Sequence, residues 1–189
     1  SRVRLGISGD QILMELHMNG QHPSSQTPAQ ADRSIQPLAL ILLLALAAVL
    51  FFVGLGSLGL TDRDEGRNAE AGREMYETGN YISPTFNYEP RFAKPVFVYW
   101  LMSLSYHVFG VSEFAARFPS AIFGVGLILL QYLFLTRCRG PVVGLFGAAM
   151  LLLNLEIIGL SRMALTDSVL IFFTTLSLYG FWLGLYGEG

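Results

Sequence analysis

Residues 34–65, SIQPLALILLLALAAVLFFVGLGSLGLTDRDE, decide the fold of this chain. From Ser34 to Thr61 the run carries no charge, and about 20 apolar residues are enough to cross a hydrocarbon core. Further runs of low charge cover 118–136, 140–155 and 168–187. The chain is 52% hydrophobic and 14% charged, whereas soluble domains have roughly 45–50% and about 25%. The sequence therefore predicts an all-α, polytopic transmembrane helix bundle.

Four apolar stretches are expected to span the membrane. Their approximate bounds are residues 36–60, 117–136, 140–161 and 168–187. A fifth uncharged stretch, PVFVYWLMSLSYHVFGVS at 95–112, is short and begins with aromatic residues of the kind that prefer the membrane interface. We therefore expect this stretch to lie along the membrane surface rather than to cross the bilayer.

This interpretation determines the topology. With the fifth stretch outside the bilayer, Arg33 and the Arg137–Arg139 pair share one side, which the positive-inside rule makes cytoplasmic. The loop 61–116 and the short loop 162–167 then meet on the opposite, external side. The polar groups of the two loops are thereby brought together.

The first external loop opens with TDRDEGRNAEAGREMYETGNY at 61–81. Thr61 and Asp64 have the spacing of a capping box, and Gly79 provides a stop, so we expect an amphipathic helix over 61–80. Three prolines then make the residues from 81 to 94 a loop. The first external loop is thus expected to hold two helices that lie at the membrane surface.

Residues 1–33 differ from the rest of the chain, because a polar, Pro- and Gln-containing segment does not support a packed core. We expect a disordered N-terminal tail, followed by a membrane domain over 34–189. Four spans leave little room for a cavity that holds two substrates, so we expect the N-terminal part of a longer protein, inactive by itself. The net charge of −2 says little about partners, because the distribution of charge matters more than its sum, and no nucleic-acid partner is predicted. The single Cys138 excludes an intrachain disulfide.

Two groups in the first loop are candidates for chemistry. A carboxylate such as Asp64 or Glu65, at the edge of a low-dielectric cavity, can act as a general base. The same pair also fits a capped, solvated helix start, and the residues alone leave both interpretations open. Lys94 can hold a lipid phosphate as a compact charge, or extend to the interface as lysines at membrane surfaces commonly do.

The second external loop, SRMALTDS at 161–168, supplies Arg162 and Asp167. These two can pair with each other as a loop cap. Alternatively, Arg162 adds a second contact to a donor phosphate, and Asp167 places a further acid beneath Asp64. Glu156, near the outer end of the third span, is a supporting candidate only, and an acid at that depth is expected to face the bundle interior or water.

Four segments in order along the chain are similar to the N-terminal part of integral membrane glycosyltransferases. They are DEGRNAEAGREM at 64–75, FAKPVFVYW at 92–100, FGVSEFAARFPSA at 109–121 and SRMALTD at 161–167. From about Pro37 to Gly187 the chain resembles the superfamily of protein O-mannosyltransferases and aminoarabinose lipid A transferases, which have the C-type membrane fold.

The resemblance implies a transferase that works at the external or periplasmic face of a bacterial-type inner or plasma membrane. It places the catalytic aspartate at Asp64, beside Glu65, the phosphate-binding lysine at Lys94 and a second-loop acid at Asp167. Members that bind zinc carry a glutamate directly before this lysine, where the present chain has Ala93. No metal or other cofactor is therefore predicted.

The predicted function is transfer of a sugar from a polyprenyl-phosphate donor to a lipid, glycan or protein acceptor, among membrane lipids. An alternative is a transporter or flippase-like protein with an external acidic site. Uncharged span centres and the lack of an internal repeat disfavour that alternative. A third interpretation is a non-catalytic assembly subunit that keeps the helices and does not depend on Asp64.

Overall fold

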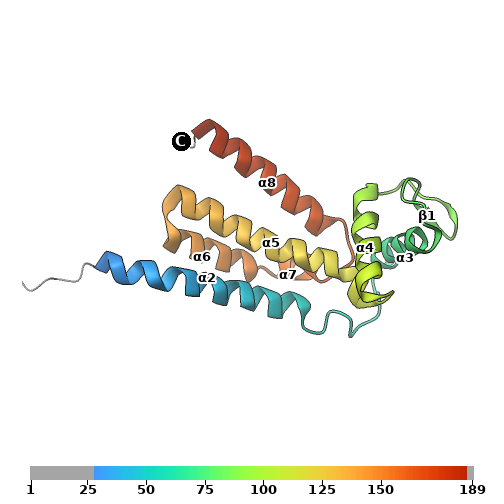
Figure 1. Ribbon diagram of the computed structural model, residues 1–189, viewed down its shortest axis with the longest axis horizontal. Coiled ribbons are helices and arrows are strands. Elements are labelled where there is room, and N and C mark those ends of the chain that lie inside the picture. Colours follow the sequence, from blue (N-terminus) through green and yellow to red (C-terminus); the bar gives the residue numbers. More distant parts are fainter. Residues whose placement is uncertain (1–27, 187–189) are drawn as a thin grey trace, which may run out of the picture. The chain divides into compact units, whose positions relative to one another are not determined.

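The structure, a computed structural model, describes the backbone of residues 28–186 and the side chains of residues 36–186. Contacts divide the chain into two compact units, 1–37 and 38–189, and every contact given below lies within the second. That unit consists of helices and one small hairpin (Figure 1). The elements in chain order are α2 Pro28–Phe52, α3 Arg63–Thr78, β1 Thr85–Phe86, β2 Glu89–Pro90, α4 Val96–Phe109, α5 Glu113–Arg139, α6 Pro141–Leu152, α7 Leu155–Ser161 and α8 Asp167–Tyr186.

Helix α2 ends earlier than the predicted span 36–60. The residues after Phe52 are rich in glycine, which is a poor helix former. Gly54 has a φ of +68°, in the left-handed region where helices commonly end. The prediction of a helix through Leu60 is therefore wrong, and the last part of the apolar run forms turns. At its other end α2 begins at Pro28, and the rest of the predicted tail, residues 1–27, lies outside the described residues.

The two helices expected in the loop 61–116 are present, and their position on the external membrane surface stays a prediction. Helix α3 begins at Arg63 and ends at Thr78, and Gly79 follows it with a φ of 68°. Its N-cap is Asp62 rather than the predicted Thr61, because the Asp62 carboxylate accepts from the first backbone N–H groups of the helix. Helix α4 covers most of the stretch 95–112. The loop between these helices carries the antiparallel β1–β2 hairpin, which the sequence did not predict.

The predicted third span, 140–161, is broken into two helices. Helices α6 and α7 meet at a bend of 68°. Asn154 causes the break, because its side chain accepts hydrogen bonds from the backbone N–H groups of Glu156 and Ile157 and so starts a new helix. The prediction of one continuous helix here is wrong.

Among the described residues, helices α5 and α8 are long and apolar enough to cross a membrane by themselves. The bent α6–α7 pair adds a third crossing if it is one span, and the apolar part of α2, Gln36–Phe52, forms a shorter helix. A helical, membrane-type fold is thus confirmed, while the number of crossings stays a prediction.

Two hydrophobic cores hold these helices together. The bundle core joins α2, α5 and α6 through Phe51, Ile128 and Leu152, all of which are buried. The cap core joins α3 and α4 to the start of α5 through Met75, Met102 and their neighbours. Each buried side chain of this size contributes roughly 1.5–3 kcal/mol, so both cores stabilise the fold.

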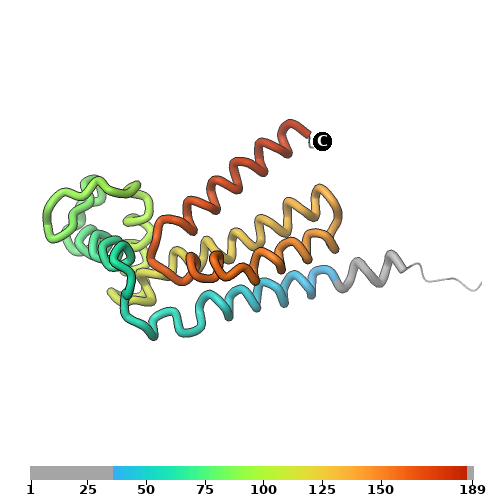
Figure 2. Tube along the Cα trace, turned by 180° about the vertical axis from the view of Figure 1, so that it is seen from behind, coloured from blue at the N-terminus to red at the C-terminus, as the bar shows by residue number. Residues whose placement is uncertain are grey.

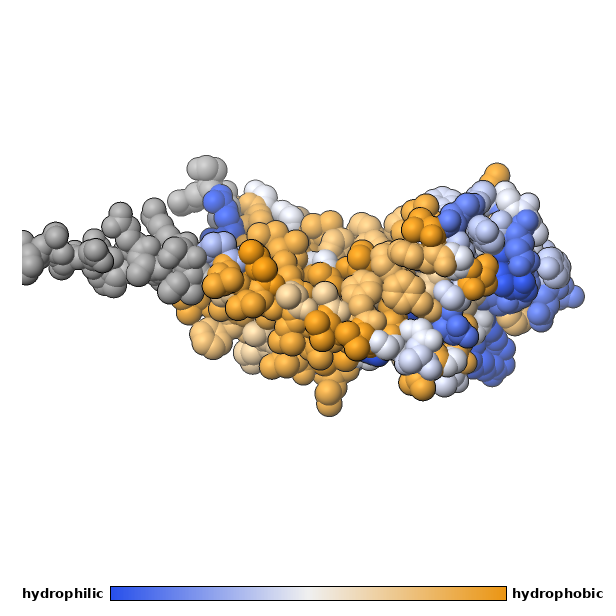
Figure 3. Space-filling model, turned by 60° about the horizontal axis from the view of Figure 1, so that its bottom comes forward, coloured by the Kyte–Doolittle hydropathy of each residue, from blue (hydrophilic) through white to orange (hydrophobic). Residues whose placement is uncertain are grey.

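The polar cap, formed by α3, α4 and the hairpin, lies at the end of the bundle where α5 begins (Figures 1 and 2). Helix α4 runs across this end instead of along α5, as expected for a helix at the membrane surface. Figure 3 shows hydrophilic side chains gathered over the cap and hydrophobic ones along the helices. Arg137 and Arg139 lie in the last turn of α5, which places them at the far end, about 40 Å away for a helix of this length.

We predict that Gly124→Ala destabilises the protein. A Cβ atom at position 124 would lie 2.3 Å from Ser161 Oγ and 2.7 Å from Ser161 Cβ, and overpacking of this kind costs about 1–3 kcal/mol. Gly159→Ala is the matched control, because a Cβ atom there meets nothing within 4 Å. Thermal unfolding of the full-length protein in detergent should show a lower Tm for Gly124→Ala only. Equal Tm values would contradict the close packing of α5 against α7.

Candidate active site

The first turn of α3 presents Asp64 to solvent. The Asp62 Oδ1 atom accepts hydrogen bonds from the backbone N–H groups of Asp64 (2.8 Å) and Glu65 (3.2 Å), which fixes where the helix starts. The Asp64 side chain is 50% exposed, and its nearest cation is Arg67, with 3.8 Å between Oδ1 and the guanidinium. An exposed pair at that distance is worth about 1 kcal/mol at most. The Asp64 carboxylate is therefore accessible to a ligand.

The next residue, Glu65, is completely buried. Its carboxylate accepts from Arg117 through both oxygens, at 2.7 Å and 3.1 Å. Oε1 also accepts from the backbone N–H of Ala164 at 2.9 Å. Both oxygens of Glu65 are thus occupied by protein groups, whereas those of Asp64 face outward.

Arg117, on the first turns of α5, uses its whole guanidinium on the protein. Besides Glu65 it donates to the backbone carbonyls of Leu55 (2.8 Å), Leu58 (2.7 Å) and Gly59 (2.9 Å). Counting the two bonds to Glu65, all five guanidinium N–H groups have acceptors. This one side chain joins the turn after α2, the start of α3 and the start of α5.

The surroundings of Glu65 favour its charged form. Burial by itself would raise the pKa of Glu65, but the hydrogen bonds from Arg117 and from the Ala164 N–H, with the charge of Arg117, outweigh burial. The pKa of Glu65 therefore lies below its ordinary value. A carboxylate held in this state is a poor proton acceptor, because its charge is already neutralised by Arg117.

The loop 162–167 is attached to the same network. The backbone N–H of Ala164 donates to Glu65, and the Ala164 carbonyl accepts from the Asn68 side chain at 3.2 Å. On the α5 side, Ser120 Oγ donates to the carbonyl of Leu165 at 3.3 Å. The expected meeting of the loops 61–116 and 162–167 at one end of the bundle is confirmed by these contacts.

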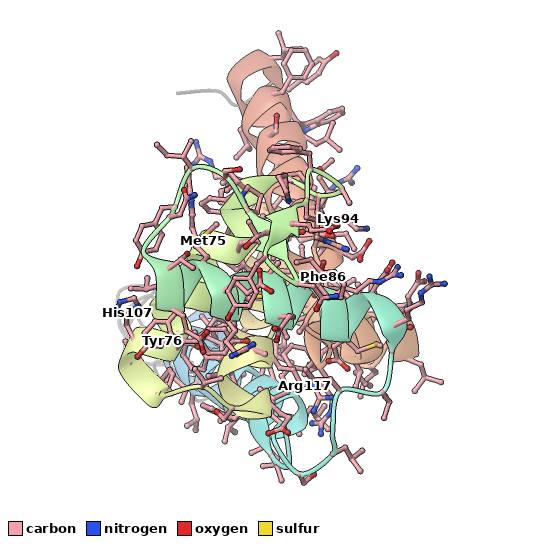
Figure 4. The ribbon with its side chains drawn as sticks, turned by 90° about the vertical axis from the view of Figure 1, so that its right-hand side faces the viewer. Met75, Tyr76, Phe86, Lys94, His107 and Arg117 are labelled. Carbon is pink, nitrogen blue, oxygen red and sulfur yellow. The ribbon has the colours of Figure 1, made fainter. Side chains whose placement is uncertain are left out.

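Lys94 lies in the loop between β2 and α4, and its side chain is partly exposed. Figure 4 shows Lys94 and Arg117 on opposite sides of α3. The loop is attached to α3 through Glu74, whose carboxylate accepts from the Thr85 hydroxyl and the Tyr88 N–H. A single helix, α3, therefore contacts the loop that carries Lys94 and also presents Asp64.

The other candidate residues have distinct surroundings. Arg162 donates from Nη1 to the carbonyl of Leu50 at 2.6 Å, so part of its guanidinium caps the end of α2. Asp167 is the first residue of α8 and is partly exposed. Glu156 is exposed in the first turn of α7. Of the two surroundings expected for Glu156, the bundle interior or water, the structure shows the exposed one, because a new helix begins after Asn154.

Three residues that shape the site were given no role from the sequence: Arg117, Asn68 and Glu74. A signal existed for Arg117, because it is the only charged residue of α5 between Glu113 and Arg137. An arginine inside an apolar helix normally needs a partner. The partners of the other two come from segments distant in sequence, so local spacing could not reveal them.

The comparison with known proteins supports the resemblance. Residues 38–187 match the family described as dolichyl-phosphate-mannose-protein mannosyltransferase. The chain belongs to this family. The predicted superfamily of C-type membrane glycosyltransferases is thereby confirmed, and with its apolar helices the chain is an integral membrane protein.

Individual known proteins are similar over most of this chain. An undecaprenyl phosphate-alpha-4-amino-4-deoxy-L-arabinose arabinosyl transferase of Pseudomonas fluorescens (strain Pf0-1) is 36% identical over 78% of this chain and 27% of its own length. An uncharacterized protein of Aquifex aeolicus is 38% identical over 75% of this chain and 34% of its own length. The chain thus spans about a third or less of these relatives.

A solved structure has the same fold over this region. The crystal structure of ArnT from Cupriavidus metallidurans bound to undecaprenyl phosphate superimposes with a TM-score of 0.75 and 28% sequence identity. The match covers 79% of this chain and 28% of that one.

The residues present do not fit the zinc site that the resemblance implies for some members. Ala93 stands at the position of the glutamate ligand and has no donor atom. Within residues 36–186, no three His, Cys, Asp or Glu side chains come together as a metal site would require. No step of the reaction is therefore assigned to a metal.

We predict that Arg117→Met destabilises the full-length protein by about 3–5 kcal/mol, because it leaves the buried Glu65 carboxylate unpaired. Arg63→Met, which removes an exposed cation of the same loop, should have little effect. The double variant Glu65→Leu with Arg117→Met should recover part of the loss, since no isolated charge remains. Thermal unfolding measures the stability of all three variants. An Arg117→Met protein as stable as Arg63→Met would contradict the buried ion pair.

A second prediction follows from the lowered pKa of Glu65. A carboxylate with a depressed pKa stabilises the folded state above its ordinary value of 4.5, and this contribution is lost as the pH falls through the folded-state pKa. The Tm of the wild-type protein should therefore fall below pH 4.5 more steeply than that of Glu65→Gln. Parallel pH profiles for the two proteins would show that Glu65 is not the group responsible.

Proposed function

We propose that this chain is part of an enzyme that transfers a sugar from a polyprenyl-phosphate carrier to a lipid, glycan or protein acceptor. Membership of the mannosyltransferase family supports the reaction class. The names of the arabinosyl transferase relatives, and undecaprenyl phosphate in the similar crystal structure, support a polyprenyl-phosphate donor. The loops 61–116 and 162–167 meet at the cap and carry the candidate acids and cation, which supports an active site at this end.

The observation that carries the proposal is the contrast between Asp64 and Glu65. Glu65 is buried and its oxygens are occupied, which gives it a positioning role. Asp64 is half exposed, next to that buried anchor, and has only a loose contact with Arg67. A carboxylate that is fixed in place yet accessible is suited to accept a proton from an acceptor group. Asp64 is therefore the proposed catalytic base.

Lys94 is the proposed partner of the donor phosphate. The acceptor nucleophile forms a bond to the anomeric carbon while the bond from that carbon to the phosphate oxygen breaks. The electron pair leaves with the polyprenyl phosphate, and the proton of the acceptor passes to Asp64. The Lys94 ammonium binds the donor phosphate in the ground state and stabilises the further negative charge that develops on it as it leaves. Removing Lys94 should therefore affect the donor step.

Arg162 and Asp167 are proposed supporting residues on the second loop. Arg162 donates one N–H to the Leu50 carbonyl, and its other N–H groups can make a second contact to the donor phosphate. Asp167 starts α8 at the cap end of the bundle, where a carboxylate can orient a hydroxyl of the sugar or of the acceptor. The positive charges at the far end of α5 support a cap that faces outward from an inner or plasma membrane.

One observation favours the transporter alternative. The bend between α6 and α7 resembles the broken helices that transporters use at their binding sites. Counterflow in proteoliposomes containing the full-length protein separates the alternatives, because a transporter exchanges labelled substrate without forming a glycosylated product. The family match favours the transferase.

We predict that Asp64→Asn in the full-length protein lowers transfer from a polyprenyl-phosphate sugar by at least about a hundredfold, because a general base contributes roughly 10²–10⁴ in rate. Transfer is measured as labelled sugar moved from a synthetic undecaprenyl-phosphate donor into the membrane acceptor fraction. Expression and Tm should be unchanged, since Asp64 is half exposed and has only one loose partner.

Asp62→Asn is the matched control for this prediction. It removes a carboxylate two residues away while keeping a side chain that caps helices equally well. Activity close to wild type in Asp62→Asn, together with loss in Asp64→Asn, supports a specific base. Wild-type turnover in Asp64→Asn would refute the assignment.

A further inference from the structure

We propose that Glu74 is a positioning residue that holds the Lys94 loop in its active conformation by stabilising a strained turn. The inference rests on the proposed role of Lys94 and concerns a residue that does not itself touch the substrate. Glu74 lies on α3, ten residues after Asp64. It is fully buried, although an isolated carboxylate is among the least favourable groups to bury.

The hydrogen bonds of Glu74 explain its burial. Its carboxylate accepts from the hydroxyl of Thr85, at the start of the hairpin, and from the backbone N–H of Tyr88, at 3.1 Å and 3.2 Å to its two oxygens. Among the described residues no cationic side chain lies within 4 Å of the Glu74 carboxylate. All the described partners of this carboxylate therefore belong to the loop that leads to Lys94.

The turn that Glu74 contacts is strained. Phe86 and Glu89 face each other across the hairpin, which leaves a two-residue turn of Asn87 and Tyr88. Both have positive φ, 54° and 61°, as a type I′ turn requires. Asparagine tolerates this conformation, whereas tyrosine is unfavourable where glycine is usual. The bond from the Tyr88 N–H to Glu74 compensates for a turn that the local sequence disfavours.

The position of this turn determines the path of the chain toward Lys94. After β2, the Arg91 N–H donates to the Pro84 carbonyl at 2.8 Å, which closes the hairpin. The Arg91 guanidinium lies 5.5 Å from the Phe86 ring centroid and donates to the Tyr99 hydroxyl at 3.4 Å. Only two residues separate Arg91 from Lys94. Loss of the turn would therefore shift the lysine relative to Asp64.

The test uses the full-length protein and the donor-dependent transfer assay. Glu74→Ala should raise the KM for the polyprenyl-phosphate donor by about ten- to a hundredfold, the size expected when a binding group is misplaced by about 1 Å. The KM for the acceptor should be unchanged. Thr85→Val, which removes one of the contacts while leaving the turn sequence intact, should produce a smaller rise in donor KM.

The decisive variant combines Glu74→Ala with Tyr88→Gly. Glycine adopts positive φ without strain, and Tyr88 is mostly exposed, so its removal costs little packing. The double variant should regain a donor KM close to wild type if Glu74 acts by stabilising the turn. Tyr88→Gly alone should be neutral. A donor KM that stays raised in the double variant, or a wild-type donor KM in Glu74→Ala, would overturn the inference.

Lys94→Met separates this inference from the proposed function. If Lys94→Met has a wild-type donor KM, the proposed role of Lys94 is wrong, and the inference fails with it. If Lys94→Met raises the donor KM and Glu74→Ala does not, only the inference fails. The role of Lys94 and the inference on Glu74 are both supported if the double variant Glu74→Ala with Lys94→Met has a donor KM close to that of Lys94→Met alone. Two changes that act on one interaction are not additive.

Discussion

The buried pair of Glu65 and Arg117 is the interaction on which the cap depends. It connects α3 to α5, and the remaining bonds of the two side chains attach the turn after α2 and the loop 162–167. Any displacement of the cap from the bundle would leave a buried charge without its partner, at a cost of several kcal/mol. The main effect of the pair is therefore to specify how the cap docks on the bundle. Its contribution to net stability is the smaller effect.

The acidic residues of α3 have different surroundings because helical geometry points them in different directions. Successive residues are about 100° apart around a helix of 3.6 residues per turn, so Asp64 faces outward while Glu65 faces the bundle. Further along, Glu74 is also buried and contacts the hairpin. One rigid element thus fixes the proposed base and contacts the loop of the proposed phosphate-binding lysine. Relative positions are better preserved on such an element than on two separate loops.

Arginine side chains also satisfy irregular backbone beside the apolar helices. The last turn of α2 and the turns after it leave carbonyl groups without helical partners. Arg162 donates to that of Leu50, and Arg117 donates to those of Leu55, Leu58 and Gly59. Unsatisfied backbone is tolerated poorly near a bilayer, where water is scarce. The same network that positions the candidate site therefore permits the chain to leave the helix at Phe52, well before the apolar run ends.

The sequence by itself determined the fold class and the presence of helix α3, and it indicated the candidate acids and lysine. Apolar runs without charge, capping residues and the order of four motifs are local signals, readable without a partner. The predicted bounds of the apolar helices were wrong where a residue inside the apolar run favours a break. Gly54 follows the end of α2, and Asn154 starts the new helix α7. Only the tertiary structure decided that Glu65 is a buried anchor and that Glu74 supports the hairpin. Their partners, Arg117 and Tyr88, lie 52 and 14 residues away, and contacts over such separations leave no periodicity in the sequence.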